Sequence, residues 1–395
     1  MRKIIFLTGR YLPKPEATGL CIHKIASCLA DEGFCVETIC MGDKEERFLL
    51  DGVNVKKIKA PFFMRESEIS SFCVFVSRLH KLFHLFNYPL RSNTLRKRFV
   101  KAALKDIDYD DEVNVVASFS PFEAVSSLKA IRKKAKCKSI NLFYYCADTL
   151  SNEQGKSAIL SAGLREKIGR QREINIFSFC KTIFVMDCHT KHYMSDNYIE
   201  FKDKMAVVDF PLLDKTFYSA ISDNPNKMIQ IVYTGTLYKT LRNPSFACDA
   251  FLKFVDLDFK LTFVGGGDCQ DILEKKATKS NGKIEYLGKQ SYEEAKHLIK
   301  QADILLSLGN LESPMMPSKI FEYISTGKPI IHFSSWEGDP CIPILSKYGN
   351  SLIISSDKDV FLIPQFLKKH NVVSWQEIET LFYKSLPSFT AGYLR

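Results

Sequence analysis

The chain alternates between short apolar runs and amphipathic segments, and this alternation occurs twice along its length. In the first half, "KIIFLTG", "CVETICMG", "VNVVASFS" and "KTIFVMD" are rich in β-branched and aromatic residues, and segments with helical periodicity such as "GLCIHKIASCLADEGF" separate them. Runs that are apolar along their whole length are typical of strands in a parallel sheet covered on both faces. The alternation therefore predicts an α/β protein.

The pattern is interrupted at residues 207–227, where prolines and Asp, Asn and Ser residues occur without a clear period. Such a segment is typical of a linker. The alternation then restarts with "MIQIVYTG", "KLTFVGGG", "KIEYLG" and "DILLSLG". A chain of 395 residues suits about two domains. We predict two Rossmann-like, doubly wound domains at 1–213 and 214–372, and a helical tail at 373–395 that is long enough to cross back to the first domain.

Composition limits the partners and the compartment. The formal net charge of +10 favours anionic partners, which include nucleic acid, anionic lipid and phosphorylated small molecules. No RNP-like or zinc-finger motif supports nucleic acid. The twelve cysteines are scattered and form no C-x-x-C, which favours reduced thiols in a cytoplasmic protein. No apolar run approaches the roughly 18 residues of a membrane span, so none is expected.

The stretch "ESPMMPSKIFEYISTGKPII" at 312–331 is the first candidate binding segment. It follows the strand-like run "DILLSLG", and ligands of open α/β sheets bind at the carboxyl ends of strands. Pro317 suits the first position of a helix, where free N–H groups, Ser318 and Lys319 would form a cradle for a phosphate. Glu322, one turn further on, suits a pair of sugar hydroxyls such as those of a ribose. The alternative is a solvated Lys–Glu pair on a helix surface.

Two further loops of the second half are candidates. "YTGTLYKTLRNP" places Gly235 at a strand end and then Lys239 and Arg242, which could neutralise a diphosphate or be solvated surface charges. "FVGGGDCQDILEKKA" places Gly266 between a strand and a helix. It resembles a dinucleotide-binding fingerprint but is not G-x-G-x-x-G, and tight strand–helix packing explains it as well.

The first half offers weaker candidates. Gly19 precedes a helix in the first strand–helix loop, where it would allow a ligand close to the backbone or form a plain joint. Asp148 ends the strand-like run "NLFYYCAD" and is a candidate for acceptor binding or acid–base work. Residues 77–105 combine Lys and Arg with apolar residues, which suits an anionic membrane surface or an ordinary helical pair with a basic face.

Several of these motifs together resemble the GT-B glycosyltransferases, and most closely the large retaining family 4. They are "YTGTL…RNP", "LTFVGGG", "IEYLGKQSYEEAKHLIKQADILLSL" and "PSKIFEYISTGKPII", and the resemblance is most specific at 229–332. It implies two domains facing across a cleft, with a nucleotide-diphosphate sugar held mostly by the second. It also implies hexosyl or related transfer, with retention, to a saccharide or lipid-linked acceptor in polysaccharide, lipopolysaccharide or glycolipid synthesis at the inner face of a membrane.

The resemblance also implies roles for individual residues. Glu322 matches the second Glu of an E-x7-E motif and would hold the ribose, and Arg242 would meet the diphosphate. The first Glu of that motif falls at Pro314, which makes Glu312 the candidate to replace it. The remaining residues of the donor site are the backbone around Met316, Pro317 and Ser318 facing sugar and phosphates, Leu287 bordering the base, and Lys239 compensating for Thr236 where the family usually has Arg.

In this reading, Arg242, Lys239, Lys319 and the helix N-terminus stabilise the leaving phosphate, so neither a metal nor another cofactor is expected. The leaving phosphate accepts the proton of the acceptor, and no paired carboxylates are needed. Two alternatives remain open: a nucleotide-sugar epimerase of the same fold, and a nucleotide- or lipid-binding scaffold that has lost catalysis, which Pro314 would explain. A Rossmann dehydrogenase is disfavoured because neither half has the full fingerprint.

Overall fold

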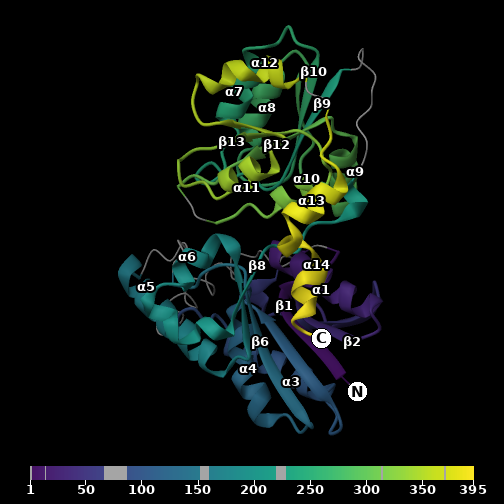
Figure 1. Ribbon diagram of the computed structural model, residues 1–395, viewed down its shortest axis with the longest axis vertical. Helices are drawn as coiled ribbons and strands as arrows, with labels where there is room; N and C mark the ends of the chain where they lie inside the picture. The colour runs from purple at the N-terminus through teal and green to yellow at the C-terminus, as the bar shows by residue number, and fades with distance from the viewer. Residues whose placement is uncertain are drawn as a thin grey trace. The chain divides into compact units, whose positions relative to one another are not determined.

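The computed structural model describes residues 2–13, 15–65, 87–151, 160–218, 228–312, 315–368 and 371–395 (Figure 1). They form two compact units, the first comprising Met1–Pro211 with Pro387–Arg395 and the second Leu212–Leu386. Each unit is a mostly or wholly parallel sheet with helices, so the predicted α/β class with two doubly wound domains is confirmed.

The first unit contains an eight-stranded sheet in the order β3-β4-β2-β1-β5-β6-β7-β8. Every neighbouring pair is parallel except β3 with β4. The central strands are buried along nearly their whole length, as the apolar runs predicted. The strands are β1 (Arg2–Arg10), β2 (Cys35–Gly42), β3 (Glu46–Leu50), β4 (Val53–Lys59), β5 (Glu112–Ser118), β6 (Ser139–Cys146), β7 (Thr182–Met186) and β8 (Met205–Val208).

The helices of the first unit cover this sheet with apolar stripes. On α3, Leu95 and Phe99 lie one turn apart and are fully buried in the core. The helix begins where the hydroxyl of Ser92 accepts a hydrogen bond from the backbone N–H of Leu95. The elements are α1 (Ala17–Asp31), η1 (Phe62–Met64), α3 (Asn93–Lys105), α4 (Phe122–Lys134), α5 (Ala162–Phe179), η2 (Asp187–His189), α6 (Thr190–Tyr193) and η3 (Asp196–Lys204).

The second unit contains a six-stranded, wholly parallel sheet in the order β11-β10-β9-β12-β13-β14. Its strands are β9 (Ile229–Thr234), β10 (Phe259–Val264), β11 (Ile284–Tyr286), β12 (Ile304–Leu308), β13 (Ile330–Phe333) and β14 (Ser351–Ile354). Its helices are η4 (Lys215–Phe217), α7 (Ser245–Leu252), α8 (Gln270–Lys279), α9 (Tyr292–Gln301), α10 (Lys319–Ile324), α11 (Cys341–Tyr348), η5 (Asp359–Leu362), α12 (Ile363–Phe366), α13 (Trp375–Leu381) and η6 (Tyr383–Ser385).

The C-terminal segment is shared between the units, although one tail at 373–395 was expected to pack on the first. The helix α13 belongs to the second unit, where the N–H of Val373 binds the carbonyl of Gly327 at 2.9 Å. The last helix, α14 (Pro387–Gly392), packs on α1 in the first unit. There the Asn114 side chain donates a hydrogen bond to the carbonyl of Leu394 at 2.8 Å. The chain therefore crosses back with its last turns.

Three expectations about surfaces and thiols can be compared with the described residues. The cysteines they include are all free, and none of their helices is long and apolar enough to cross a membrane. Of the basic segment at 77–105, residues 77–86 lie outside the described part. Within it, Phe99 and Val100 of α3 are buried in the core, so the apolar residues of this helix pack on the sheet.

Candidate functional site

The helix α10 is attached to the carboxyl end of β9, next to β12 in the sheet. The hydroxyl of Tyr323, which is 2% exposed, accepts a hydrogen bond from the backbone N–H of Thr234 at 2.7 Å. The spacing of Ile320, Phe321 and Ile324 buries one side of the helix. Gly327, at φ 77°, then ends the helical region. This attachment places the 316–322 segment at the edge where ligands of open α/β sheets bind.

Glu322 and Lys319 form an ion pair of unequal exposure. The Lys319 ammonium donates to the carboxylate at 2.7 Å, and the two side chains are 32% and 3% exposed, respectively. The ring of Tyr292 lies 5.6 Å from the same ammonium. Among the described residues, Lys319 is the one side chain that donates to Glu322. Since a carboxylate can accept about four hydrogen bonds, Glu322 keeps free acceptor capacity. Because Glu322 is buried, the two residues do not form the solvated Lys–Glu pair that was the alternative interpretation of the sequence.

Arg242 is held by a residue that the sequence did not point to. Its Nε and Nη2 donate to Oδ1 of Asn310 at 3.1 and 2.6 Å. Asn310 is 3% exposed, and its amide nitrogen donates to the carbonyl of Met315 at 2.8 Å. One amide therefore connects the loop after β9 with the loop after β12. The only signal was its place two residues after a buried strand.

Lys239 is engaged elsewhere. Its ammonium lies 2.8 Å from the carboxylate of Asp271 on α8, and its backbone N–H donates to Asp268. Hydrogen bonding to Asp271 raises the pKa of Lys239. Both side chains of this pair are about half exposed, and exposed pairs are weak. The predicted basic pair is thus divided, with Arg242 on Asn310 and Lys239 on α8.

The three consecutive glycines have different surroundings. A Cβ at Gly265 would lie 1.8 Å from the carbonyl oxygen of Gly235, and one at Gly267 would lie 1.7 Å from that of Leu237. These two glycines therefore serve close packing between the loops after β9 and β10. Gly266 has open space, because the nearest atom to its added Cβ is 3.9 Å away on Lys289. It is the position where a ligand can approach the backbone.

The remaining donor candidates lie around the same edge. Glu312 is exposed, at φ 45°, between β12 and α10, and Pro314 lies outside the described residues. Met316 and Pro317 are buried and Ser318 is half-buried, and α10 begins at Lys319 rather than at Pro317. Leu287, after β11, is 37% exposed.

A buried hydrogen-bond network of His332, Asp339 and Ser307 lies next to the loop after β12. His332 binds Asp339 through Nε2 at 2.9 Å and Ser307 through Nδ1 at 3.0 Å. Burial acts to raise the pKa of Asp339, but the hydrogen bond and charge of His332 outweigh it and the pKa is lowered. His332, Asp339 and Cys341 have the spacing of a metal site, yet both ring nitrogens already have partners. We interpret the cluster as structural.

In the first unit, Gly19 lies inside α1 and is buried. A Cβ there would be 1.9 Å from the carbonyl oxygen of Arg10, so this glycine allows α1 to pack on the end of β1. Asp148 is half-buried after β6, in a loop fixed by the fully buried carboxylate of Glu173. Glu173 accepts hydrogen bonds from the backbone of Leu150 and the hydroxyl of Ser151, both at 2.7 Å.

Comparison with known proteins identifies this architecture. Residues 229–357 match the family model described as glycosyl transferases group 1. No curated protein matches the chain in sequence. The solved sucrose-phosphate synthase from Thermosynechococcus elongatus superposes with a TM-score of 0.68 at 11% identity, covering 100% of this chain and 98% of that one.

Two other solved structures agree. The catalytic domain of starch synthase IV from Arabidopsis thaliana, bound to ADP and acarbose, gives a TM-score of 0.58 at 11% identity and covers 99% and 96% of the two chains. WaaG, a glycosyltransferase involved in lipopolysaccharide biosynthesis, gives 0.52 at 13% identity and covers 99% of each chain. These likenesses extend over both units and show the fold. The chain has the GT-B fold of these glycosyltransferases, and the match to the group 1 glycosyl transferases is confined to its residues 229–357.

Proposed function

We propose that the second unit binds a nucleotide-diphosphate sugar at the carboxyl ends of β9, β10 and β12, and that the first unit binds the acceptor. The observation that carries the donor site is the buried carboxylate of Glu322, which has one donor partner among the described residues and spare acceptor capacity. A buried acceptor of this kind favours a ligand with hydroxyl donors. The two ribose hydroxyls of a nucleotide meet that requirement.

The diphosphate would be bound by the two cations of this edge. Asn310 orients the guanidinium of Arg242 through Nε and Nη2, which leaves other N–H groups to donate to phosphate oxygens. The ammonium of Lys319 is about one third exposed and has further donors beyond the one on Glu322. As the bond to the sugar breaks, negative charge grows on the leaving phosphate, and these cations stabilise it. The open backbone at Gly266 would lie along the nucleotide.

Retention of the anomeric configuration follows if the acceptor attacks from the side that the phosphate leaves. The departing phosphate oxygen then takes the proton of the acceptor hydroxyl, the new glycosidic bond forms as the bond to phosphate breaks, and no side-chain base is required. Glu312 is the carboxylate we assign to the sugar, because it is exposed in the loop between β12 and α10.

For the acceptor we propose a lipid-linked saccharide of surface polysaccharide or lipopolysaccharide synthesis, used at the inner face of the plasma membrane. Two observations support this class. WaaG, which shares the fold, is described as acting in lipopolysaccharide biosynthesis. The net charge of +10 favours association with an anionic membrane surface.

The donor site is tested by calorimetric titration of UDP, GDP and ADP into the full chain and its Glu322→Gln variant. We expect one nucleotide to bind, and the variant to lose about tenfold in affinity because a neutral amide is a weaker acceptor for the ribose hydroxyls. Glu293→Gln, at an exposed carboxylate of α9, is the matched control and should bind like the wild type. Equal affinity of wild type and Glu322→Gln would remove Glu322 from the site.

A further inference from the structure

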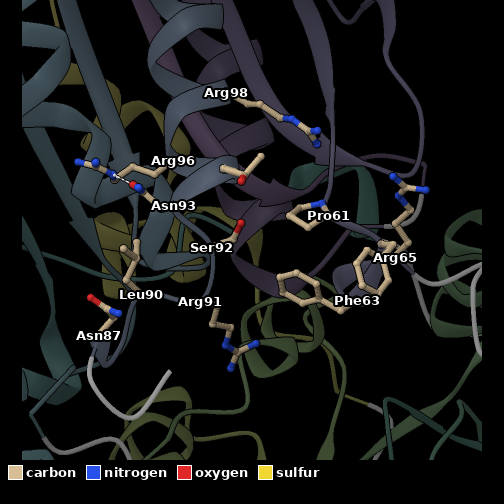
Figure 2. Close-up of a pocket in the computed structure, with 12 residues that line it drawn as sticks. Pro61, Phe63, Arg65, Asn87, Leu90, Arg91, Ser92, Asn93, Arg96 and Arg98 are labelled. Carbon is tan, nitrogen blue, oxygen red and sulfur yellow. Dashed lines mark hydrogen bonds between the residues drawn. The ribbon is translucent and has the colours of Figure 1, made fainter. Parts of the chain in front are cut away.

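A pocket of about 770 Å³ lies in the first unit, next to the end of β4. Figure 2 shows its two sides, with Pro61 and Phe63 on one and the segment from Asn87 through the start of α3 on the other. Four of the lining residues are arginines, and none of the described lining residues is acidic. They are Arg65, Arg91, Arg96 and Arg98. The pocket therefore has a strongly positive wall at the carboxyl edge of the sheet, where ligands of such folds bind.

Two of these arginines converge on adjacent carbonyl groups. The Nη1 group of Arg98 donates to the carbonyl of Lys59, and Nε of Arg65 donates to the carbonyl of Ala60 at 2.9 Å. Both guanidinium groups therefore bind adjacent backbone carbonyls at the end of β4, one from α3 and one from the residue after η1. A guanidinium has five N–H donors, so the bond to Lys59 leaves donors of Arg98 for a ligand.

The start of α3 is fixed from beneath by a buried carboxylate. Oε1 of Glu123, which is fully buried on α4, accepts hydrogen bonds from the backbone N–H groups of Arg91 and Ser92 at 2.6 and 2.5 Å. These bonds hold the turn that carries the Arg91 side chain. Arg96 donates to Asn93 at 2.9 Å and turns to the other side of the helix (Figure 2). Arg65, Arg91 and Arg98 are thus the cations we assign to the pocket.

Two of the arginines of this pocket, Arg91 and Arg98, form no ion pair with the described carboxylates. In the part of the chain that the structure describes, no carboxylate lies within 4.0 Å of the guanidinium groups of Arg91 and Arg98. Other cations near the same strands do have such partners, for example Lys57 with Glu46 at 3.1 Å. Several like charges in a half-buried pocket repel one another, and a bound anion removes that repulsion.

We propose that this pocket binds the phosphate or diphosphate group of the acceptor, so that the acceptor is a phosphate ester. Planar guanidinium groups match the oxygen pairs of a phosphate, and they do so better than ammonium groups. The half-buried rings of Phe62 and Phe63 add an apolar wall for the carbon skeleton next to the phosphate. The inference rests on the proposed function in one respect, namely that the first unit binds the acceptor. The phosphate itself can come from a soluble sugar phosphate or from a lipid headgroup.

The first test is titration of inorganic pyrophosphate into the full chain carrying Arg242→Gln, which weakens any binding in the second unit. Adding Arg65→Gln and Arg98→Gln to this background should lower the pyrophosphate affinity at least about tenfold, because two charge-assisted contacts are lost. Lys97→Gln with Lys101→Gln removes the same charge from exposed positions of α3 and should leave the affinity within about twofold. Arg98→Lys, which keeps the charge but not the planar fork, should give an intermediate loss.

The second test distinguishes a soluble phosphate ester from a lipid headgroup. The same substitutions are made in the chain that retains Arg242, and the proteins are floated with vesicles of phosphatidylcholine alone or of phosphatidylcholine with phosphatidic acid. Loss of flotation in the Arg65/Arg98 variant but not in the Lys97/Lys101 variant would assign a lipid phosphate. Pyrophosphate binding with no flotation difference would assign a soluble phosphate ester. Equal behaviour of both variants in both tests would overturn the proposal. Nucleotide binding should be unchanged in the Arg65/Arg98 variant, which keeps this result independent of the donor-site test.

Discussion

The two units share one sheet architecture but hold their site cations differently. In the second unit each cation is held by a side chain, Arg242 by Asn310 and Lys319 by Glu322. In the first unit, Arg65 and Arg98 are held by backbone carbonyls. A site fixed by side-chain pairs needs particular residues at particular positions, whereas backbone carbonyls are available at any sequence. The family model matches a segment of the second unit alone.

Two buried histidines, His332 of the second unit and His189 of the first, differ in the partners of their ring nitrogens. In the second unit both ring nitrogens of His332 have side-chain partners. In the first unit, Nε2 of His189 is buried without a partner among the described residues, and its ring contacts the backbone of Ala147, next to Asp148. Burial, with His192 acting in the same direction, lowers the pKa of His189 to about 4. The two units should therefore respond differently to acid.

The largest predicted effect is a loss of stability of the first unit between pH 6.5 and 4. An unfolded histidine takes up a proton as the pH falls through 6.5, but His189 stays neutral in the folded state until about pH 4. The free energy of unfolding should fall by about 3 kcal/mol more in the wild type than in His189→Gln over this range. Circular dichroism in urea at several pH values measures it.

The positions of the tryptophans allow the two units to be followed separately. Both tryptophans, Trp336 and Trp375, lie in the second unit, so their fluorescence reports that unit while circular dichroism reports both. The low pKa of Asp339 contributes stability that is lost only below about pH 4, so the tryptophan signal should not follow the His189 effect. Burial and Asp106 raise the pKa of Glu37 to about 7, so this residue makes the folded state more stable as the pH falls. The effect of Glu37 is the same in the wild type and in His189→Gln, and comparing the two proteins therefore removes it. Identical pH profiles for wild type and variant would refute the assignment.

A smaller effect is expected for Asn310→Ala. The change removes the acceptor that orients Nε and Nη2 of Arg242 and should lower the nucleotide affinity about tenfold. Lys239→Gln is the matched control, because Lys239 is bound to Asp271 and its removal should change the affinity less than about twofold. If Lys239→Gln weakens nucleotide binding more than Asn310→Ala does, then Lys239 and not Arg242 is the cation that binds the donor.

Sequence patterns predicted the sheets because buried parallel strands are continuous apolar runs. They also selected Glu322, Lys319 and Arg242 as candidates, and each of these residues lies within a few positions of a strand end or helix start. The partner of Arg242 could not be predicted, because Asn310 is 68 positions away in the chain and becomes its neighbour only when β9 and β12 pair. For the same reason the sequence could not show that Lys239 and Arg242 have different partners.

The G-G-G run and the arginine pocket show a second limit of prediction from sequence. The G-G-G run suggested ligand contact, but only Gly266 has open space, because loop packing requires glycine at 265 and 267. The pocket combines Arg65 with Arg91 and Arg98 from another segment, and Arg65 and Arg98 converge through the carbonyl groups of Ala60 and Lys59. Because every residue has a backbone carbonyl, the sequence does not indicate which carbonyls bind an arginine.

The most direct test of a donor site in the second unit is hydrogen–deuterium exchange of the full chain with and without the nucleoside diphosphate that binds. The proposed donor contacts lie in the loops around 234–243 and 307–322, so these peptides should exchange more slowly when the nucleotide is present. Peptides covering 59–65 and 91–98 should be unchanged. Protection confined to those first-unit peptides, with none at 307–322, would contradict the assignment of the donor to the second unit.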